Sequence, residues 1–204
     1  MIARNIVFFC LLVGNLILLA PHDATAARKA ATSPGTYSDW GGDIDEVTII
    51  QPFNAAGYDA IAVESFDTAG VALPNPKDNT YPAVLGAIKV IKPAFMAGLE
   101  ENARRKVDAS NPRGTGKGRT LVIRARVTKL DPGSQAARYF LPGAGAVKIA
   151  LAGEIVDGTT KKTLVRFKQE RRSAVGFFGG GYEALFKRTA HQIGGDIAGL
   201  VNAF

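Results

Sequence analysis

TLVIRARVTKL, residues 120–130, opens the stretch that decides the fold. Its apolar residues recur at every second position, the period of a strand with one buried and one exposed face. Residues 146–156 and 163–172 show the same alternation. The turn Asp157-Gly158 lies between these two segments, and Asp-Gly tolerates the positive φ of tight hairpins. The stretch therefore predicts three consecutive strands, of which the last two form an antiparallel hairpin.

The rest of the chain predicts two further strands and two helices. Residues 47–51 and 58–66 are short β-like runs. A helix is expected over residues 82–107, with a kink or short break at Pro93, because an internal proline removes a hydrogen bond and clashes with the preceding turn. A second amphipathic helix is predicted over 182–204. The order β-β-α-β-β-β-α predicts a single α+β domain, a mostly antiparallel sheet with two helices packed on one face.

Three glycines in the last predicted helix need an explanation. Gly194, Gly195 and Gly199 would each weaken a helix by roughly 1 kcal/mol relative to alanine. One explanation is close packing of this helix on the sheet. The other is a weak helix that the sheet holds in place.

The first 26 residues have the features of a secretory signal peptide. Arg4 precedes an apolar run over residues 6–20, and Ala24-Thr25-Ala26 is a small-residue cleavage site. An uncleaved N-terminal anchor is the alternative, although the run is shorter than the roughly 20 residues of a membrane span. We expect residues 27–42 to be a flexible polar leader and 43–204 to form the domain. The mature chain would be exported to the periplasm or the exterior without a transmembrane span.

Cys10 is the only cysteine and lies in this apolar run, without the lipobox of a lipidated cysteine. Removal of the signal peptide would leave a chain with no cysteine. That excludes disulfides, thiolate nucleophiles and zinc–thiolate sites from the mature protein.

The chain has a formal net charge of +7. Such a balance favours anionic partners, such as lipid headgroups, lipopolysaccharide, cell-wall polymers or acidic proteins. Six cations would share the exposed face of the three central strands: Arg124, Arg126, Lys148, Arg166, Lys168 and Arg172. We interpret this face as a docking surface for an anionic envelope component or envelope protein. The alternative is a solvated face that Glu154 and Glu170 partly neutralise.

No motif for catalysis, metal binding or a cofactor is recognisable. Gly179-Gly180-Gly181 precedes a helix but lacks the lysine and Ser/Thr of a phosphate-binding loop. The acidic positions 39, 43, 45 and 46 lack the length and spacing of a calcium loop, so a solvated turn is expected. His191 is expected at the edge of a helix stripe, and no G-x-S-x-G motif supports a triad with Ser173. Phe167 is expected to point inward, which leaves the face without the exposed aromatics of an RNA-binding sheet.

A set of turn motifs gives the chain a family resemblance. Gly143-x-Gly145, the apolar strand after it, Asp157-Gly158-Thr159-Thr160 and Gly179-Gly180-Gly181 before the last helix carry it. Over roughly residues 45–204 the chain resembles a family of bacterial envelope proteins, secreted or lipid-anchored, known as a domain of unknown function (number four-four-one-zero). The resemblance implies an envelope protein in which these glycines are structural, and it supplies no catalytic residues.

Three functions remain open at this level. The first is a non-enzymatic binding or envelope-assembly module that uses the basic face. The second is an envelope hydrolase or transferase that uses His191. The third is a purely structural envelope protein whose surface charge is incidental. No nucleic-acid partner is expected for an exported chain.

Overall fold

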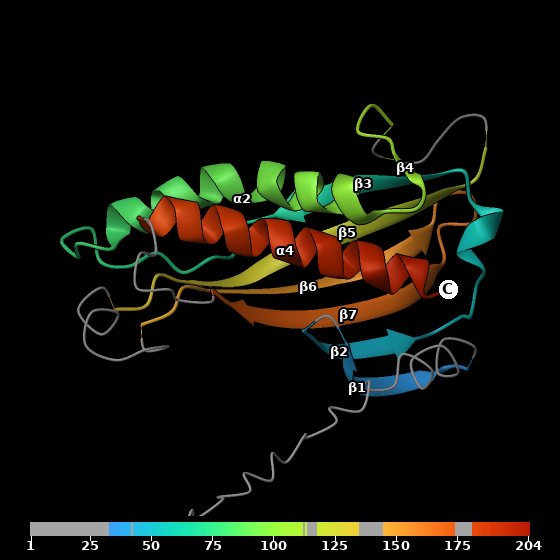
Figure 1. Cartoon of the computed structure of the whole chain (residues 1–204), viewed down its shortest axis with the longest axis horizontal. Coiled ribbons are helices and arrows are strands. Elements are labelled where there is room, and N and C mark those ends of the chain that lie inside the picture. Colours follow the sequence, from blue (N-terminus) through green and yellow to red (C-terminus); the bar gives the residue numbers. More distant parts are fainter. Residues whose placement is uncertain (1–32, 42, 112, 114–117, 135–144, 174–180) are drawn as a thin grey trace, which may run out of the picture.

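A seven-stranded mixed sheet with two helices on one face forms the domain in this computed structural model (Figure 1). The structure describes residues 33–41, 43–111, 113, 118–134, 145–173 and 181–204. Its elements are β1 (Gly35–Gly41), β2 (Ile44–Ile49), a 3-10 turn (Ala55–Gly57), β3 (Ala60–Asp67), α2 (Tyr81–Asn102), β4 (Lys106–Val107), β5 (Thr120–Asp131), β6 (Lys148–Asp157), β7 (Thr163–Arg172) and α4 (Tyr182–Asn202). The predicted α+β single-domain class is confirmed.

The strands lie in the order β1-β2-β7-β6-β5-β3-β4. The neighbouring pairs β1/β2, β2/β7, β7/β6 and β6/β5 are antiparallel, as expected. They include the predicted hairpin of β6 and β7. Strand β3 instead runs parallel to both β5 and β4. The chain returns from β3 to β5 through α2, and a crossover through a helix is what joins parallel strands. The sheet is therefore mixed, with a parallel end that the sequence did not reveal.

The alternation of the three central strands is confirmed by burial. On β5 the residues predicted to face inward, Leu121, Ile123, Ala125 and Val127, are at most 4% exposed. Phe167 of β7 is also buried, as predicted. These side chains form one core with the apolar sides of the helices. Burial of one large apolar side chain contributes about 1.5–3 kcal/mol to folding. The apolar face of the sheet is therefore the one that packs against the helices.

Three boundaries differ from the predictions. Residues 35–41 of the expected leader form β1, which pairs with β2 at the edge of the sheet. Helix α2 ends at Asn102, and Lys106–Val107 form the short strand β4. Of the kink or short break predicted near Lys92, the break does not occur, because α2 is continuous through Pro93. The predicted signal peptide lies outside the described residues.

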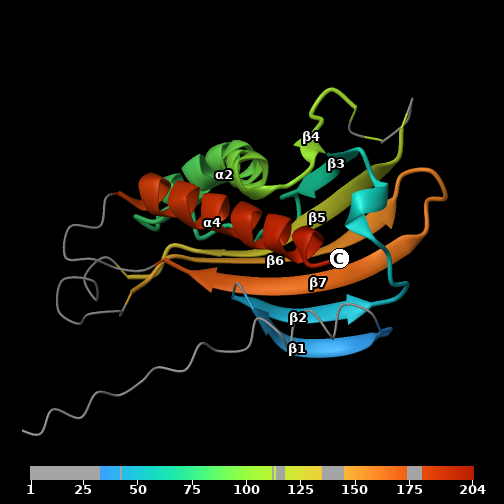
Figure 2. The same cartoon turned by 45° about the vertical axis from the view of Figure 1, so that its right-hand side comes forward.

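The two helices lie side by side across the sheet (Figure 2). Their contact is close enough that a β-carbon on Gly194 of α4 would stand 2.1 Å from the carbonyl oxygen of Phe95 on α2. The glycine therefore serves helix-on-helix packing, and the expected packing on the sheet is wrong for it. A β-carbon on Gly195 would stand 3.1 Å from the side-chain nitrogen of Asn102 on α2, whereas a β-carbon on Gly199 would have no neighbour within 4 Å.

Helix α2 is, among the described residues, the one helix whose length and mean hydropathy of 1.4 would allow it to cross a membrane. Val84, Ile91, Phe95 and Leu99 of this helix are fully buried in the domain core. The core helix of a folded domain has the same composition, so the hydropathy of α2 is accounted for by its packing.

Candidate functional site

The outer face of the sheet carries all six cations that the sequence assigned to one face. Among the described elements, α2 and α4 cover the opposite face (Figure 1). Strand register aligns the cations in the rows Arg124–Glu154–Arg166, Arg126–Ala152–Lys168 and Lys148–Arg172. The predicted arrangement on one face is therefore what the fold produces.

Carboxylates neutralise most of these cations. The ion pairs are Arg124 with Glu64 and with Glu154, Lys168 with Glu46 (2.8 Å), Arg172 with Glu170 (3.5 Å) and Lys148 with Asp131 (3.7 Å). Exposed ion pairs of this kind contribute at most about 1 kcal/mol each to stability. They also reduce the positive electrostatic potential of the face. The face is thus a mixed array of charges, in which Glu154 and Glu170 do take part.

Arg126 and Arg166 differ from the other four, because neither forms an ion pair with a described residue. Both are exposed and lie on strands that flank β6. Between them, Ala152 of β6 has only a methyl group on this face, while the missing β-carbon of Gly153 points to the core side, toward Phe167. The result is an open hollow of about 380 Å³ lined by Arg124 and the two free arginines.

Two carboxylates also line this hollow, Asp67 and Glu154. Glu154 is engaged, since it accepts from Arg124 and from the hydroxyl of Thr163 at 2.9 Å. Asp67 accepts the N–H of Ala69 at 2.8 Å. Each free guanidinium retains five N–H donors for a ligand, so the unused hydrogen-bonding capacity of the hollow is mainly that of a donor.

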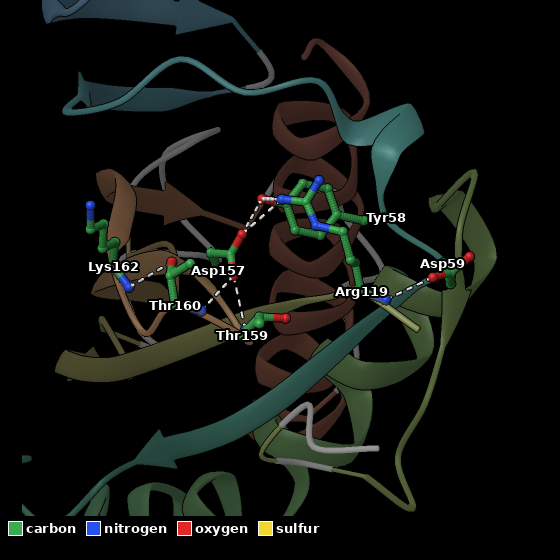
Figure 3. Close-up of polar contacts among 7 residues, drawn as sticks. All are labelled: Tyr58, Asp59, Arg119, Asp157, Thr159, Thr160 and Lys162. Carbon is green, nitrogen blue, oxygen red and sulfur yellow. Dashed lines mark hydrogen bonds and ion pairs between the residues drawn. The ribbon is translucent and has the colours of Figure 1, made fainter. Parts of the chain in front are cut away.

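A second polar cluster lies at the end of the sheet where β6 turns into β7 (Figure 3). The side chain of Asp157 is only 6% exposed there. Its Oδ2 accepts from the hydroxyl of Tyr58 at 2.7 Å and from Nη2 of Arg119 at 2.9 Å. Its Oδ1 accepts the backbone N–H groups of Thr159 and Thr160 at 2.9 and 2.8 Å. Four donors therefore satisfy the two oxygens of this carboxylate.

Arg119 is fixed on several sides. Its guanidinium carbon lies 4.3 Å from the centroid of the Tyr58 ring, and Nη2 also donates to the Tyr58 hydroxyl at 3.0 Å. The backbone N–H of Arg119 donates to Asp59 at 2.7 Å. Within the described chain Nε and Nη1 have no partner, and the side chain is 55% exposed. Its remaining donors are thus available at the surface.

The environment moves the pKa values of both acids in this cluster away from the neutral range. Burial, together with the hydrogen bond to Asp157, raises the pKa of Tyr58 to about 12. Burial alone would raise the pKa of Asp157, but its hydrogen bonds, led by that from the Thr160 N–H, hold it well below its usual range. At neutral pH the tyrosine is protonated and the aspartate is ionised, so neither group is suited to exchange protons.

The turn that contains Asp157 is built differently from the expectation. The positive φ belongs to Lys161 (60°) and is not supplied by Asp157-Gly158. The connection spans residues 158–162, and the Asp157 carboxylate orders it by accepting two of its N–H groups. The sequence indicates Asp157 only as a turn former and gives no sign of its contacts with Tyr58 and Arg119.

A pocket of about 340 Å³ opens beside this cluster. Its lining includes the apolar residues Pro52, Phe53 and Leu164 and the polar residues Tyr58, Arg119, Asp157, Thr160 and Lys162. Phe53 is held in place by aromatic contacts, stacked on Phe204 at 4.5 Å and edge-on to Tyr58 at 5.9 Å.

The residues considered for catalysis are separate in the structure. His191 lies on α4, and its Nε2 is 2.8 Å from a carboxylate oxygen of Glu101. Ser173 is buried, and its hydroxyl accepts the N–H of Val147 at 3.1 Å. No hydrogen bond between His191 and Ser173 is found within the described residues.

The acidic positions near the start of the domain are engaged with β7. Asp43 pairs with Arg171 at 2.8 Å, and Asp45 accepts the N–H of Glu170. Among the described residues no group of three or more His, Cys, Asp or Glu side chains is arranged to hold a metal ion.

The predicted glycine loops are described only in part. Gly145 has a φ of 70°, in the left-handed region that favours glycine. Gly181 is the N-cap of α4. Gly143, Gly179 and Gly180 lie outside the described residues. Gly133 is a further structural glycine that no sequence motif marks: a β-carbon there would stand 2.3 Å from the Gly145 carbonyl oxygen.

Comparison with known proteins finds a similar family and similar folds. Solved structures with a similar arrangement include a PelC dodecamer from Paraburkholderia phytofirmans, 12% identical, covering 73% of this chain and 96% of that one, with a TM-score of 0.40. Protein XCC0632 from Xanthomonas campestris, of family DUF330, is 14% identical over 75% of this chain and 90% of that one, with a TM-score of 0.36. Similarities this distant assign no function. No curated protein matches the chain. The family model described as a domain of unknown function (DUF4410) matches residues 83–176, within the stretch that resembles this family by its sequence motifs.

Proposed function

We propose that the exported chain is a non-enzymatic binding module that holds an extended anionic polymer of the cell envelope along β6, on the open face of the sheet. The observation that carries this proposal is the pair Arg126 and Arg166, which form no ion pair with a described residue and lie on either side of β6, offset from each other by two residues along the strand. The envelope location rests on the predicted signal peptide, in residues outside the described part of the chain.

The shape of the face favours a single extended chain over a flat partner. Strand β6 presents the small residues Ala150 and Ala152 on this face, while β5 and β7 present long side chains in the same rows. Strands β5 and β7 are two strand spacings apart, about 10 Å. The face is thus a trough of roughly the width of one polymer strand, lined by side chains that can donate to it from both sides.

The burial or hydrogen bonding of three polar groups, Asp157, Tyr58 and Ser173, makes each unsuited to proton transfer, which supports a binding role. Asp157 has its oxygens occupied by donors, Tyr58 has a raised pKa, and Ser173 is buried against a backbone N–H. A general acid or base needs a pKa near the working pH and a free path to its substrate. None of these three groups meets both requirements.

Neutralising the two free arginines tests the proposal. The double variant R126Q/R166Q should bind a fluorescent poly-glutamate about tenfold more weakly, since two exposed charge contacts of roughly 0.7 kcal/mol each sum to about 1.4 kcal/mol. Fluorescence anisotropy at several salt concentrations measures it, and added salt should weaken binding of the unmodified chain.

The matched control is K187Q/R188Q, which removes the same charge from exposed positions of α4 on the helix side. Binding by this control should be unchanged. Equal losses in the two double variants would show that only net charge matters, and this would contradict a site on β6. Loss of binding to phosphatidylglycerol vesicles, without any effect on poly-glutamate, would identify a membrane surface as the partner instead.

A further inference from the structure

We infer that the pocket between Phe53, Arg119 and Lys162 is a second binding site, separate from the trough along β6. It takes a small molecule in which a carboxylate or phosphate group is attached to a planar apolar ring. The inference rests on which hydrogen-bonding groups of the pocket are already used and which are free.

The acceptor positions of Asp157 and Tyr58 in the pocket are occupied. Asp157 accepts four hydrogen bonds, two at each oxygen. The Tyr58 hydroxyl donates to Asp157 and accepts from Arg119. The one carboxylate in the lining therefore has no free position for a cation or for a ligand hydroxyl.

The free groups are donors with positive charge. Arg119 uses Nη2 for Asp157 and Tyr58, and its Nε and Nη1 have no partner in the described part of the chain. The exposed Lys162 ammonium likewise makes no hydrogen bond to a described residue. Two cations and one engaged carboxylate line the pocket, which leaves one positive charge in excess. The amides of Gln51 and Asn54 also line the pocket, but its free charged groups are both donors, and these favour an oxyanion.

The arginine is held in place before any ligand binds. Its guanidinium is bonded to a buried carboxylate and lies over the Tyr58 ring, so little side-chain freedom remains to be lost on binding. With Nη2 in use, the fixed guanidinium still presents Nε–H and Nη1–H as separate charged donors to a carboxylate or phosphate. Asp157 thus acts as a positioning residue for Arg119.

The apolar lining accounts for the rest of the ligand. Phe53 is fixed between Phe204 and Tyr58, and Pro52 and Leu164 lie in the same lining. A pocket of about 340 Å³ is of the size that takes small molecules. A planar ring beside Phe53 would place an attached anionic group near Arg119 and Lys162.

Titration with three compounds tests the inference: phenyl phosphate, benzoate and inorganic phosphate. Both ring compounds should give saturable amide shifts over residues 53–58 and 158–162 in NMR spectra of the full mature chain. Inorganic phosphate should bind at least about fivefold more weakly, because it makes no ring contact. Failure of both ring compounds to saturate at millimolar concentration would overturn the inference, and equal affinity for inorganic phosphate would overturn its ring component.

Three variants locate the site. K162Q should weaken phenyl phosphate binding at least about fivefold through loss of a charged hydrogen bond, while K89Q, which removes an exposed lysine from α2, should leave binding unchanged. Equal effects of K162Q and K89Q would contradict the site. R126Q/R166Q should also leave phenyl phosphate binding unchanged. A loss in that variant would place the ligand in the trough, so the two sites can fail independently.

Discussion

Gly98 of α2 lies so close to His191 of α4 that a β-carbon on the glycine would stand 1.8 Å from the His191 carbonyl oxygen. The two helices therefore cross with their backbones in contact. G98A should lower the free energy of unfolding by about 3 kcal/mol, because overpacking forces the backbones apart. Urea denaturation measures this value.

Gly199 provides the control for that substitution. It lies in α4 with no other atom near its missing β-carbon. G199A should leave stability unchanged or raise it by up to about 1 kcal/mol through helix propensity. If G98A and G199A had the same effect, the close helix crossing would be refuted.

Asp157 should make the stability of the domain sensitive to acid. Its pKa in the folded state is lowered, so its contribution is present above the unfolded value of about 3.9 and is lost as pH falls through the folded value. D157N should be less stable than the unmodified chain at pH 7 by about 1–3 kcal/mol. Denaturation curves at several pH values should show this difference shrinking below about pH 4. A difference that is constant with pH would contradict the ionised, hydrogen-bonded Asp157.

Tyr58 should respond at the opposite end of the pH scale. Its pKa is raised to about 12, so its contribution to stability is complete below its ordinary pKa of about 10 and is lost as pH rises through the folded value. Tyrosinate absorbance of the folded chain should contain a late alkaline step, and Y58F should lack it. A titration curve that Y58F leaves unchanged in that range would disprove the buried hydroxyl.

The central strands could be predicted because the alternation of apolar and polar residues in each one indicates which of its faces is buried. Residues 163–172 alternate so regularly that β7 has the predicted bounds. Strand β1 was missed because its sequence, GTYSDWG, has mixed polarity, and an edge strand is defined by its pairing with β2. The parallel direction of β3 could not be predicted either, since it depends on how α2 packs.

The candidate sites show the same limit. The six cations could be assigned to one face because a strand fixes the direction of each side chain. Partial neutralisation by Glu154 and Glu170 was the predicted alternative. The pairs with Glu64 and Asp131 could not be predicted, because these carboxylates reach the cations through strand pairing and local bulges. The cluster around Asp157 joins segments 38 and 99 residues away. The sequence indicated only one part of that cluster, the turn motif Asp157-Gly158-Thr159-Thr160.

The central claim is that an anionic polymer lies along β6 between Arg126 and Arg166. NMR titration of the labelled mature chain with poly-glutamate tests it most directly. The amides of residues 150–154 and the side chains of Arg126 and Arg166 should shift and saturate together, while α2 and α4 stay unperturbed. Saturable shifts confined to the helix side, or none anywhere on β6, would contradict the claim.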